Sequence, residues 1–273
     1  MKLAIITDIH HAPSQPGGLS ILPVVADFVA RANAAGADLL IDLGDRIDDF
    51  DRGTDLALAT ELAEIFHRFE GRRVHLQGNH DVVNLTEEDQ ERLLGRRRGH
   101  VAIDLGGVRL LVWEPDVRLE RGIGFPPAAG ELEWLTTELN SDLRPALIAT
   151  HIPFSGASMA GNYYFENNPD YSVHPDHAFV RAAVEATGAA AIWLSGHVHW
   201  NSLTTVGNVR HLVVQSTSET FTTAPHPACA TAMLEIADGS ARLEVSGNDP
   251  LSLAFPFQRS DARRWPQPRP KVS

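Results

Sequence analysis

The stretch Leu43-Gly44-Asp45-Arg46-Ile47-Asp48 follows the apolar run Leu39-Leu40-Ile41, with Asp42 between them. A short run of β-favouring residues that ends at a glycine and an acid predicts a buried strand with a carboxylate at its carboxyl end. Open α/β folds bind their ligands at this edge of the sheet. A Gly-Asp pair is also an ordinary turn dipeptide, so Asp45 gains significance only because four other stretches of the chain end in a similar way.

The composition limits the classes of protein that fit the chain. Its 273 residues, 43% of them hydrophobic, predict one domain with a substantial core. There are 35 acidic and 23 basic residues, and the formal net charge of −12 argues against general nucleic-acid binding. An anionic substrate would therefore need a local cation. Cys229 is the only cysteine, Asp8 interrupts the first apolar run and no stretch is long enough to span a bilayer, so we expect a cytoplasmic protein that does not bind membranes.

Strand and helix patterns alternate along most of the chain. Strands are predicted over residues 2–7, 38–43, 73–76, 100–104, 108–113, 146–149 and 190–194. Helices are predicted over residues 19–35, 54–69, 86–94, 130–139 and 176–187. We expect Thr54 to cap the second helix, and Thr86 with Asp89 to form only half of a capping box. Hairpin strands follow from residue 203 to about 245, and residues 258–273 are predicted to be a C-terminal extension of a 1–257 domain.

Five of the predicted strands end in side chains that can bind a metal ion. They are Asp8 and His10, Asp45, Asn79 and His80, His151, and His197 with His199. A single histidine at a strand end is usually an ordinary hydrogen-bonded residue. Five such strand ends are hard to explain as turns alone, because turns use Gly, Asn or Ser as readily as His. Carboxylate, imidazole and amide donors without a thiolate suit Fe, Mn, Zn, Ni or Co better than Ca or Mg. Two ions about 3.5–4 Å apart, bridged by a carboxylate, would account for a set of this size.

The ordered motifs resemble those of the calcineurin-like metallophosphoesterase superfamily. They are Asp8-Ile-His10, Gly44-Asp45, Gly78-Asn79-His80-Asp81, Thr150-His151 and Gly196-His197-Val198-His199, which together span residues 8–199. The resemblance implies an α/β (α+β) fold, a four-layer αββα sandwich of two mixed β-sheets flanked by helices. It also implies two divalent or trivalent metal ions of the Mn, Fe or Zn type. The first would be bound by Asp8, His10 and His199, the second by Asn79, His151 and His197, with Asp45 as the bridge.

The same resemblance implies roles around the metals. His80 would act as a general acid or as a donor to the phosphoryl oxygens, and Asp48 would orient it; Asn79 and His80 would also contact the substrate. A helix-start cap is the alternative for Asp48, and we favour a loop-fixing role for Asp81. Protein phosphatases of the superfamily carry an arginine directly after the second aspartate of the Gly-Asp block, which is Asp48 here. This chain has Asp49 at that position. One group that would grip a phosphomonoester dianion is therefore missing.

The motif spacing and the length look most like class III cyclic-nucleotide phosphodiesterases and bacterial glycerophosphodiesterases. We therefore expect a dinuclear metal-dependent phosphodiesterase that hydrolyses small phosphodiesters by attack of a metal-bound hydroxide. A phosphomonoesterase or a nuclease on the same centre is the alternative. A non-catalytic metal-binding scaffold is a third hypothesis, against which the complete set of implied ligands counts.

All three tyrosines, Tyr163, Tyr164 and Tyr171, fall in the stretch 155–177, just after His151. Long loops in compact domains often act as lids, and aromatic side chains can stack on a base. We expect Tyr163 and Tyr164 to contact the substrate. A surface loop or a dimer contact is an equal alternative, so a homodimer or a higher homo-oligomer stays open.

Overall fold

A computed structural model of the chain describes residues 1–15, 18 and 20–258, and within them two mixed six-stranded sheets lie face to face. The first sheet has the order β12 (Leu251–Pro256), β11 (Ser240–Ser246), β10 (Thr231–Ala237), β1 (Lys2–Ile6), β2 (Leu39–Asp42) and β3 (Arg72–His75). The second has the order β4 (Val101–Asp104), β5 (Arg109–Val112), β6 (Ala146–Ala149), β7 (Ala191–Ser195), β9 (Val209–Val213) and β8 (Ser202–Val206).

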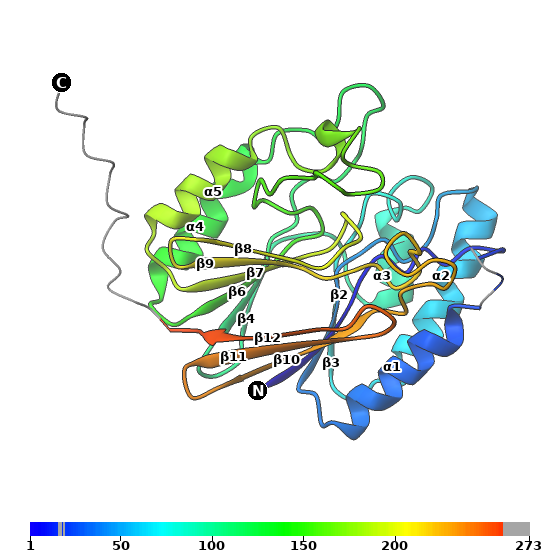
Figure 1. Ribbon diagram of the computed structural model, residues 1–273, viewed down its shortest axis with the longest axis horizontal. Coiled ribbons are helices and arrows are strands. Elements are labelled where there is room, and N and C mark those ends of the chain that lie inside the picture. Colours follow the sequence, from blue (N-terminus) through cyan, green and yellow to red (C-terminus); the bar gives the residue numbers. More distant parts are fainter. Residues whose placement is uncertain (16–17, 19, 259–273) are drawn as a thin grey trace.

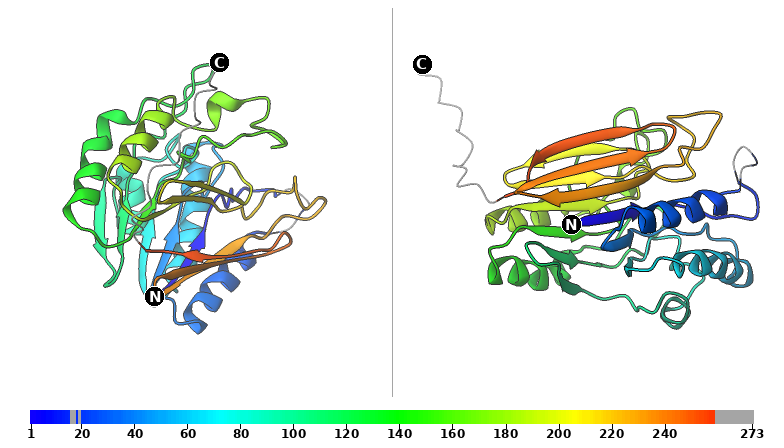
Figure 2. Two further views of the ribbon diagram at one scale, coloured as in Figure 1. Left: turned by 60° about the vertical axis from the view of Figure 1, so that its left-hand side comes forward. Right: turned by 90° about the horizontal axis from the view of Figure 1, so that it is seen from below.

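Helices cover the outer face of each sheet (Figures 1 and 2). On the first sheet they are α1 (Leu22–Ala34) and α2 (Arg52–Phe66), with α3 (Glu87–Leu94) beside α2. On the second they are α4 (Leu132–Ser141), which follows the short 3-10 helix η2 (Ala129–Glu131), and α5 (His177–Ala186). The predicted αββα sandwich of two mixed sheets is confirmed.

The central parallel strands are buried on both faces. Leu3 and Ile5 of β1 lie in the core between the sheets, whereas Ala4 and Ile6 pack under α1 and α2. Because successive side chains of a strand point to opposite faces, a strand covered on both faces needs apolar residues at nearly every position. This requirement is why Leu3 to Ile6 and Leu39 to Ile41 are all apolar, and the buried Asp42 that ends β2 is paired with Arg46.

Three local details differ from the expectations. Helix α2 begins at Arg52 and is capped by Asp51, whose carboxylate accepts the N–H groups of Gly53 and Thr54, because a carboxylate also suits the positive end of the helix dipole. The capping box of α3 is complete, since Asp89 reaches back to the N–H of Thr86 at 3.0 Å. Strand β12 was not predicted. It lies at the sheet edge after Pro250 and ends in Pro256, and an edge is where a strand tolerates proline.

The expected C-terminal extension, residues 258–273, lies outside the described residues apart from Gln258. Within the described part of the chain, no helix is both long and apolar enough to cross a membrane.

Candidate metal centre

The predicted ligand side chains all follow the carboxyl ends of parallel strands. Strands β1, β2 and β3 run parallel in the first sheet, and β6 and β7 run parallel in the second. The loops after these five strands meet at one edge of the sandwich, where they place Asp8 and His10, Asp45, Asn79 and His80, His151, and His197 with His199. The structure therefore brings together, from five separate loops, every residue that the motifs singled out as a ligand.

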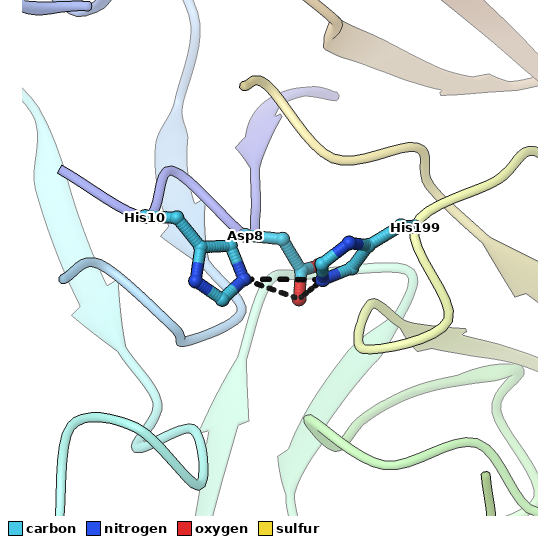
Figure 3. Close-up of side chains that lie close together, drawn as sticks. All are labelled: Asp8, His10 and His199. Atoms are coloured by element: carbon cyan, nitrogen blue, oxygen red, sulfur yellow. Dashed lines mark hydrogen bonds and ion pairs between the residues drawn. The ribbon is translucent and has the colours of Figure 1, made fainter. Parts of the chain in front are cut away.

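Asp8, His10 and His199 form the first group of ligand atoms (Figure 3). The Nε2 atoms of His10 and His199 lie 3.1 Å apart, and Asp8 Oδ1 lies 3.4 Å from His199 Nε2 and 4.0 Å from His10 Nε2. Two nitrogen ligands on one ion, each with a bond of about 2.0–2.1 Å, are separated by roughly 3 Å. The spacing of this group matches that of a shared cation.

Asp45, His151 and His197 form the second group. His151 Nε2 lies 3.2 Å from Asp45 Oδ2 and 3.3 Å from the side-chain oxygen of Asn79. All four side chains are buried. The same Asp45 Oδ2 atom lies 3.8 Å from Nε2 of His10 in the first group. Asp45 therefore stands between the two groups, as a bridging carboxylate must.

Each of the four histidines has one ring nitrogen held from outside the centre, which leaves the other for an ion. The partners are Asp48 for His10 Nδ1 (2.7 Å), Glu219 for His199 Nδ1 (3.3 Å), the Leu43 carbonyl for His151 Nδ1 (2.9 Å) and the Tyr171 carbonyl for His197 Nε2 (2.7 Å). His197 Nδ1 is buried and has no hydrogen-bond partner among the described residues. Metal-binding histidines are oriented by outer partners of this kind.

The carboxylates of the centre raise the pKa values of two of its histidines, His199 and His151, and so favour their protonated forms in the absence of a metal. Burial lowers the pKa of His199, but Asp8 and Glu219 raise it to about 10 overall. Burial likewise opposes charge on His151, yet Asp45 and Asp8 raise its pKa to about 9. Burial and the neighbouring His151 lower the pKa of His197 to about 3, so that ring is neutral and able to bind a metal.

The backbone around the ligands is strained, and glycines permit its close packing. Left-handed φ angles occur at Asp8 (48°), His10 (44°), Asp45 (53°), His197 (70°) and His199 (60°). Such conformations are costly for residues other than glycine and concentrate at functional sites. A Cβ atom at Gly78 would collide with Asp45, and one at Gly196 would collide with Thr7 and Asp8. The glycines of both motifs are therefore required because the loops touch there.

A buried network fixes the loop of Asp45 against the loop of Asn79. The Asp81 carboxylate accepts the backbone N–H groups of Asp45 (2.9 Å), Arg46 (3.0 Å) and Gly78 (2.9 Å). Asp81 is thus the loop-fixing residue that we expected. The buried Arg46, which sequence reasoning missed, pairs with Asp81 at 3.0 Å and with Asp42 at 2.8 Å. Its pattern in the sequence, an arginine next to a turn aspartate, gave no sign of burial.

The expected partner of His80 is wrong by one residue. Nδ1 of His80 is hydrogen-bonded to the carboxylate of Asp49, whereas Asp48 binds Nδ1 of His10. Asp48 is also no helix cap, since α2 is capped by Asp51. The reason is the direction of the chain after Asp45: Ile47 turns into the core and Asp48 and Asp49 reach different rings. Sequence spacing alone does not distinguish two consecutive aspartates.

A pocket of about 860 Å³ opens over the centre. It is lined by Asp45, Asn79, His80, His197 and His199 together with Asp49, Val82, Val83, Arg118, Leu119, Arg121, Tyr163, Tyr164, Phe165, Tyr171 and Glu219. The two tyrosines expected to contact substrate are in its wall. Arg118, Arg121 and Glu219 were missed, because they lie far from the motifs in the chain.

The donor set fits a pair of cations. Asp8, His10 and His199 would hold one, Asn79, His151 and His197 would hold the other, and Asp45 would join them. Two features support this fit. Nδ1 of His197 is buried without a hydrogen-bond partner in the described part of the chain, and Nε2 of His10 lies 3.1 Å from Nε2 of His199.

Comparisons with known proteins identify a family and a shared fold. The model of the family described as calcineurin-like phosphoesterase matches residues 1–201. A dimetal phosphatase from Danio rerio has a similar structure, with a TM-score of 0.74 and 13% identity over 94% of this chain and 99% of that one. So does the purple acid phosphatase PPD1 from yellow lupin (Lupinus luteus) seeds, with a TM-score of 0.68 and 13% identity over 94% and 54%.

A third similar structure is GAP50, described as the anchor in the inner membrane complex of Plasmodium, with a TM-score of 0.62 and 9% identity over 96% of this chain and 89% of that one. At these identities the structural likeness shows the fold alone. A comparison with curated proteins gave no match. The family model, by contrast, covers more than half of the sequence and includes every motif that supplies the two ligand groups. The chain therefore belongs to the calcineurin-like phosphoesterase family and is a metallophosphoesterase, a hydrolase of phosphoric esters.

Proposed function

We propose that the enzyme is a dinuclear metal-dependent phosphodiesterase that hydrolyses small phosphodiesters of the cyclic-nucleotide or glycerophosphodiester type. The observation that carries the proposal is the position of Asp45 between two ligand groups at the base of a pocket that His80 also lines. Two bound ions would supply a hydroxide nucleophile near neutral pH and would neutralise charge on a phosphoryl oxygen.

His80 is suited to donate a proton or a hydrogen bond to the ester. Its backbone N–H donates to Asp45 Oδ1 at 2.9 Å, and its Nδ1 is held by Asp49, so Nε2 is the atom left for the substrate. Burial lowers the pKa of His80, but the charges of Asp45 and Asp49 raise it above the ordinary value overall. A protonated His80 can stabilise a phosphoryl oxygen or protonate the departing alkoxide.

The charges around His80 favour a diester over a monoester. Asp49 occupies the position of the missing arginine, and both Asp49 and Glu219 line the pocket. A phosphomonoester carries about one more negative charge than a diester at neutral pH, and each nearby carboxylate repels it. The diester is therefore the substrate that this set of side chains opposes least.

The donor atoms also guide the proposal for the metals and the partners. Imidazole and carboxylate ligands without sulfur suit Mn, Fe or Zn. The partner that we propose is a small phosphoester, since the pocket of about 860 Å³ has the size of a small-molecule site.

Purified protein reconstituted with Mn²⁺ tests the proposal. We expect faster hydrolysis of bis(p-nitrophenyl) phosphate than of p-nitrophenyl phosphate, measured as kcat/KM from released nitrophenolate. His80→Ala is the control: it should keep the metal but lower kcat, which would show that the measured hydrolysis takes place at this centre. A higher kcat/KM for the monoester would replace the proposal by a phosphomonoesterase, and no turnover of either ester with bound metal would leave a non-catalytic scaffold.

A further inference from the structure

The pocket lining includes two exposed cations that the proposed chemistry does not use. Arg118 and Arg121 line the pocket, and they are its only arginine or lysine residues among the described ones. They lie in the loop between β5 and η2, where residues 118–123 are all exposed. The acid groups Asp45, Asp49 and Glu219 line the same pocket, and the chain as a whole has a net charge of −12. These arginines are the local cations that an anionic substrate needs.

The loop that carries the arginines is braced. Glu120 and Gly124 exchange backbone hydrogen bonds of 2.9 and 3.0 Å, which closes a short hairpin around Arg121. At its tip, the N–H of Gly122 donates to the Tyr171 hydroxyl at 2.6 Å. Tyr171 belongs to the 3-10 helix η3 (Pro169–Tyr171), and its carbonyl accepts from Nε2 of His197. The hairpin is therefore tied to the residue that orients a candidate metal ligand.

The two guanidinium groups keep hydrogen-bond capacity for a ligand. The side chain of Arg118 is 69% exposed and pairs only loosely with Asp116, at 3.5 Å. Arg121 has no hydrogen bond or ion pair with any described residue. Both arginines are exposed, whereas Asp45 and His197 of the same pocket lining are buried, and no hydrogen bond or ion pair among the described residues joins either arginine to the ligand groups. We therefore assign to the arginines an anion other than the phosphoryl group at the centre.

The lining of the same pocket also includes aromatic and apolar side chains. Tyr163 and Tyr164 expose 75% and 49% of their surfaces, and Val83 and Leu119 of the same lining are also exposed. Large exposed apolar side chains grouped at a pocket mouth mark a binding surface. Exposed tyrosine rings stack well on planar groups of a ligand.

We infer that Arg118 and Arg121 form a subsite for a second phosphate-like anion of the substrate, and that the aromatic part joining this anion to the scissile phosphoryl group lies on Tyr163 and Tyr164. The inference rests on the proposed function, because it takes the phosphoryl end to be held over the metal centre. It adds the substrate class: an ester with an aromatic body and two separate anionic ends.

Two matched probes test the subsite by binding alone. Phenylphosphonate has one anionic end, and 1,4-phenylenebisphosphonate has a second one across the ring. Calorimetry with the Mn²⁺-reconstituted enzyme should show the bisphosphonate bound about ten-fold more tightly, because a charge-assisted contact to arginine exceeds an ordinary hydrogen bond. The Arg118→Gln, Arg121→Gln double variant should reduce this preference to about two-fold, the statistical advantage of two equivalent ends.

Two further variants separate the subsite from general charge effects. Arg242→Gln removes a charge from an exposed position on β11, outside the pocket lining, and should keep the ten-fold preference. Tyr171→Phe keeps the carbonyl that holds His197 but removes the hydroxyl that holds Gly122, so it should weaken the preference without loss of bound metal.

The outcomes distinguish the subsite from the proposed function. Equal affinity for the two probes, or a ten-fold preference that survives loss of both arginines, overturns the subsite. An arginine-dependent preference in an enzyme that hydrolyses neither nitrophenyl ester supports the subsite and contradicts the proposed function.

Discussion

Nδ1 of His10 donates to the carboxylate of Asp48 at 2.7 Å, which ties a candidate metal ligand to a residue that the motif pattern assigns to His80. The adjacent Asp49 holds His80 instead. Two consecutive aspartates thus have separate tasks, one on the metal side and one on the substrate side of the centre.

Asp48→Asn should weaken metal binding. Loss of an outer carboxylate partner typically reduces the metal affinity about 10–100-fold, because the imidazole loses orientation and basicity. Calorimetric titration with Mn²⁺ measures the change. Asp49→Asn is the matched control, and it should leave the affinity within about two-fold while lowering kcat. Unchanged metal affinity in Asp48→Asn, with a lower kcat, would return Asp48 to the role of orienting His80.

Asp45→Ala should lose metal and activity together, since Asp45 Oδ2 lies near both ligand groups. His80→Ala should keep both ions but lower kcat by about 10²–10⁴-fold, the usual loss for a general acid or base. Metal analysis after gel filtration, together with kcat on bis(p-nitrophenyl) phosphate, separates the two effects. Full metal occupancy in folded Asp45→Ala would contradict its position as the bridge.

Gly78→Ala should destabilise the protein and disturb the centre. The new Cβ would collide with the side chain and backbone of Asp45, and neither can move without moving the Asp81 network. Overpacking of this kind costs about 1–3 kcal/mol, which thermal unfolding of the metal-free protein measures. Gly107→Ala is the control, because a Cβ there meets nothing within 4 Å and its φ is not left-handed. Equal melting temperatures for the two variants would show that the Gly78 contact is not tight.

The stability of the metal-free protein should fall as the pH decreases from about 6.5 to about 4. His211 on β9 is buried, stacks on Trp193 and has no hydrogen bond to either ring nitrogen among the described residues. Burial lowers its pKa to about 4. Between that value and the unfolded value of about 6.5 the unfolded chain binds more protons, so stability is present above pH 6.5 and is lost by pH 4, at up to about 3 kcal/mol.

His211→Phe removes this titrating group. Urea unfolding with chelator at pH 7.5 and at pH 5 should show a smaller loss of stability in the variant than in the wild type. The same loss in both proteins would assign the acid sensitivity to other groups.

Local pattern was sufficient for most of the fold. Strands such as β1 and β2 are buried on both faces, so every residue from Leu3 to Ile6 and from Leu39 to Ile41 had to be apolar. The hairpin strands predicted from residue 203 to about 245 are also present, with turns at Gly207-Asn208 and Asp238-Gly239. Strand β12 was not predicted, because Pro250 and Pro256 flank its alternating pattern and argue against a strand. An edge position tolerates such prolines.

The candidate site also has a part that the sequence predicted, the metal ligands, and a part that it did not, their outer partners. Ligand residues stand directly after buried strands, and since parallel strands end at one edge of a sheet, the sequence by itself determined which carboxylates and imidazoles gather there. Only the tertiary structure decided which outer partner each ring receives: Asp48 for His10, Asp49 for His80, Glu219 for His199. It also decided that Arg118 and Arg121 reach the pocket. These contacts join segments far apart in the chain or choose between adjacent aspartates, and they depend on the path of each loop after its strand, which no local pattern of residues specifies.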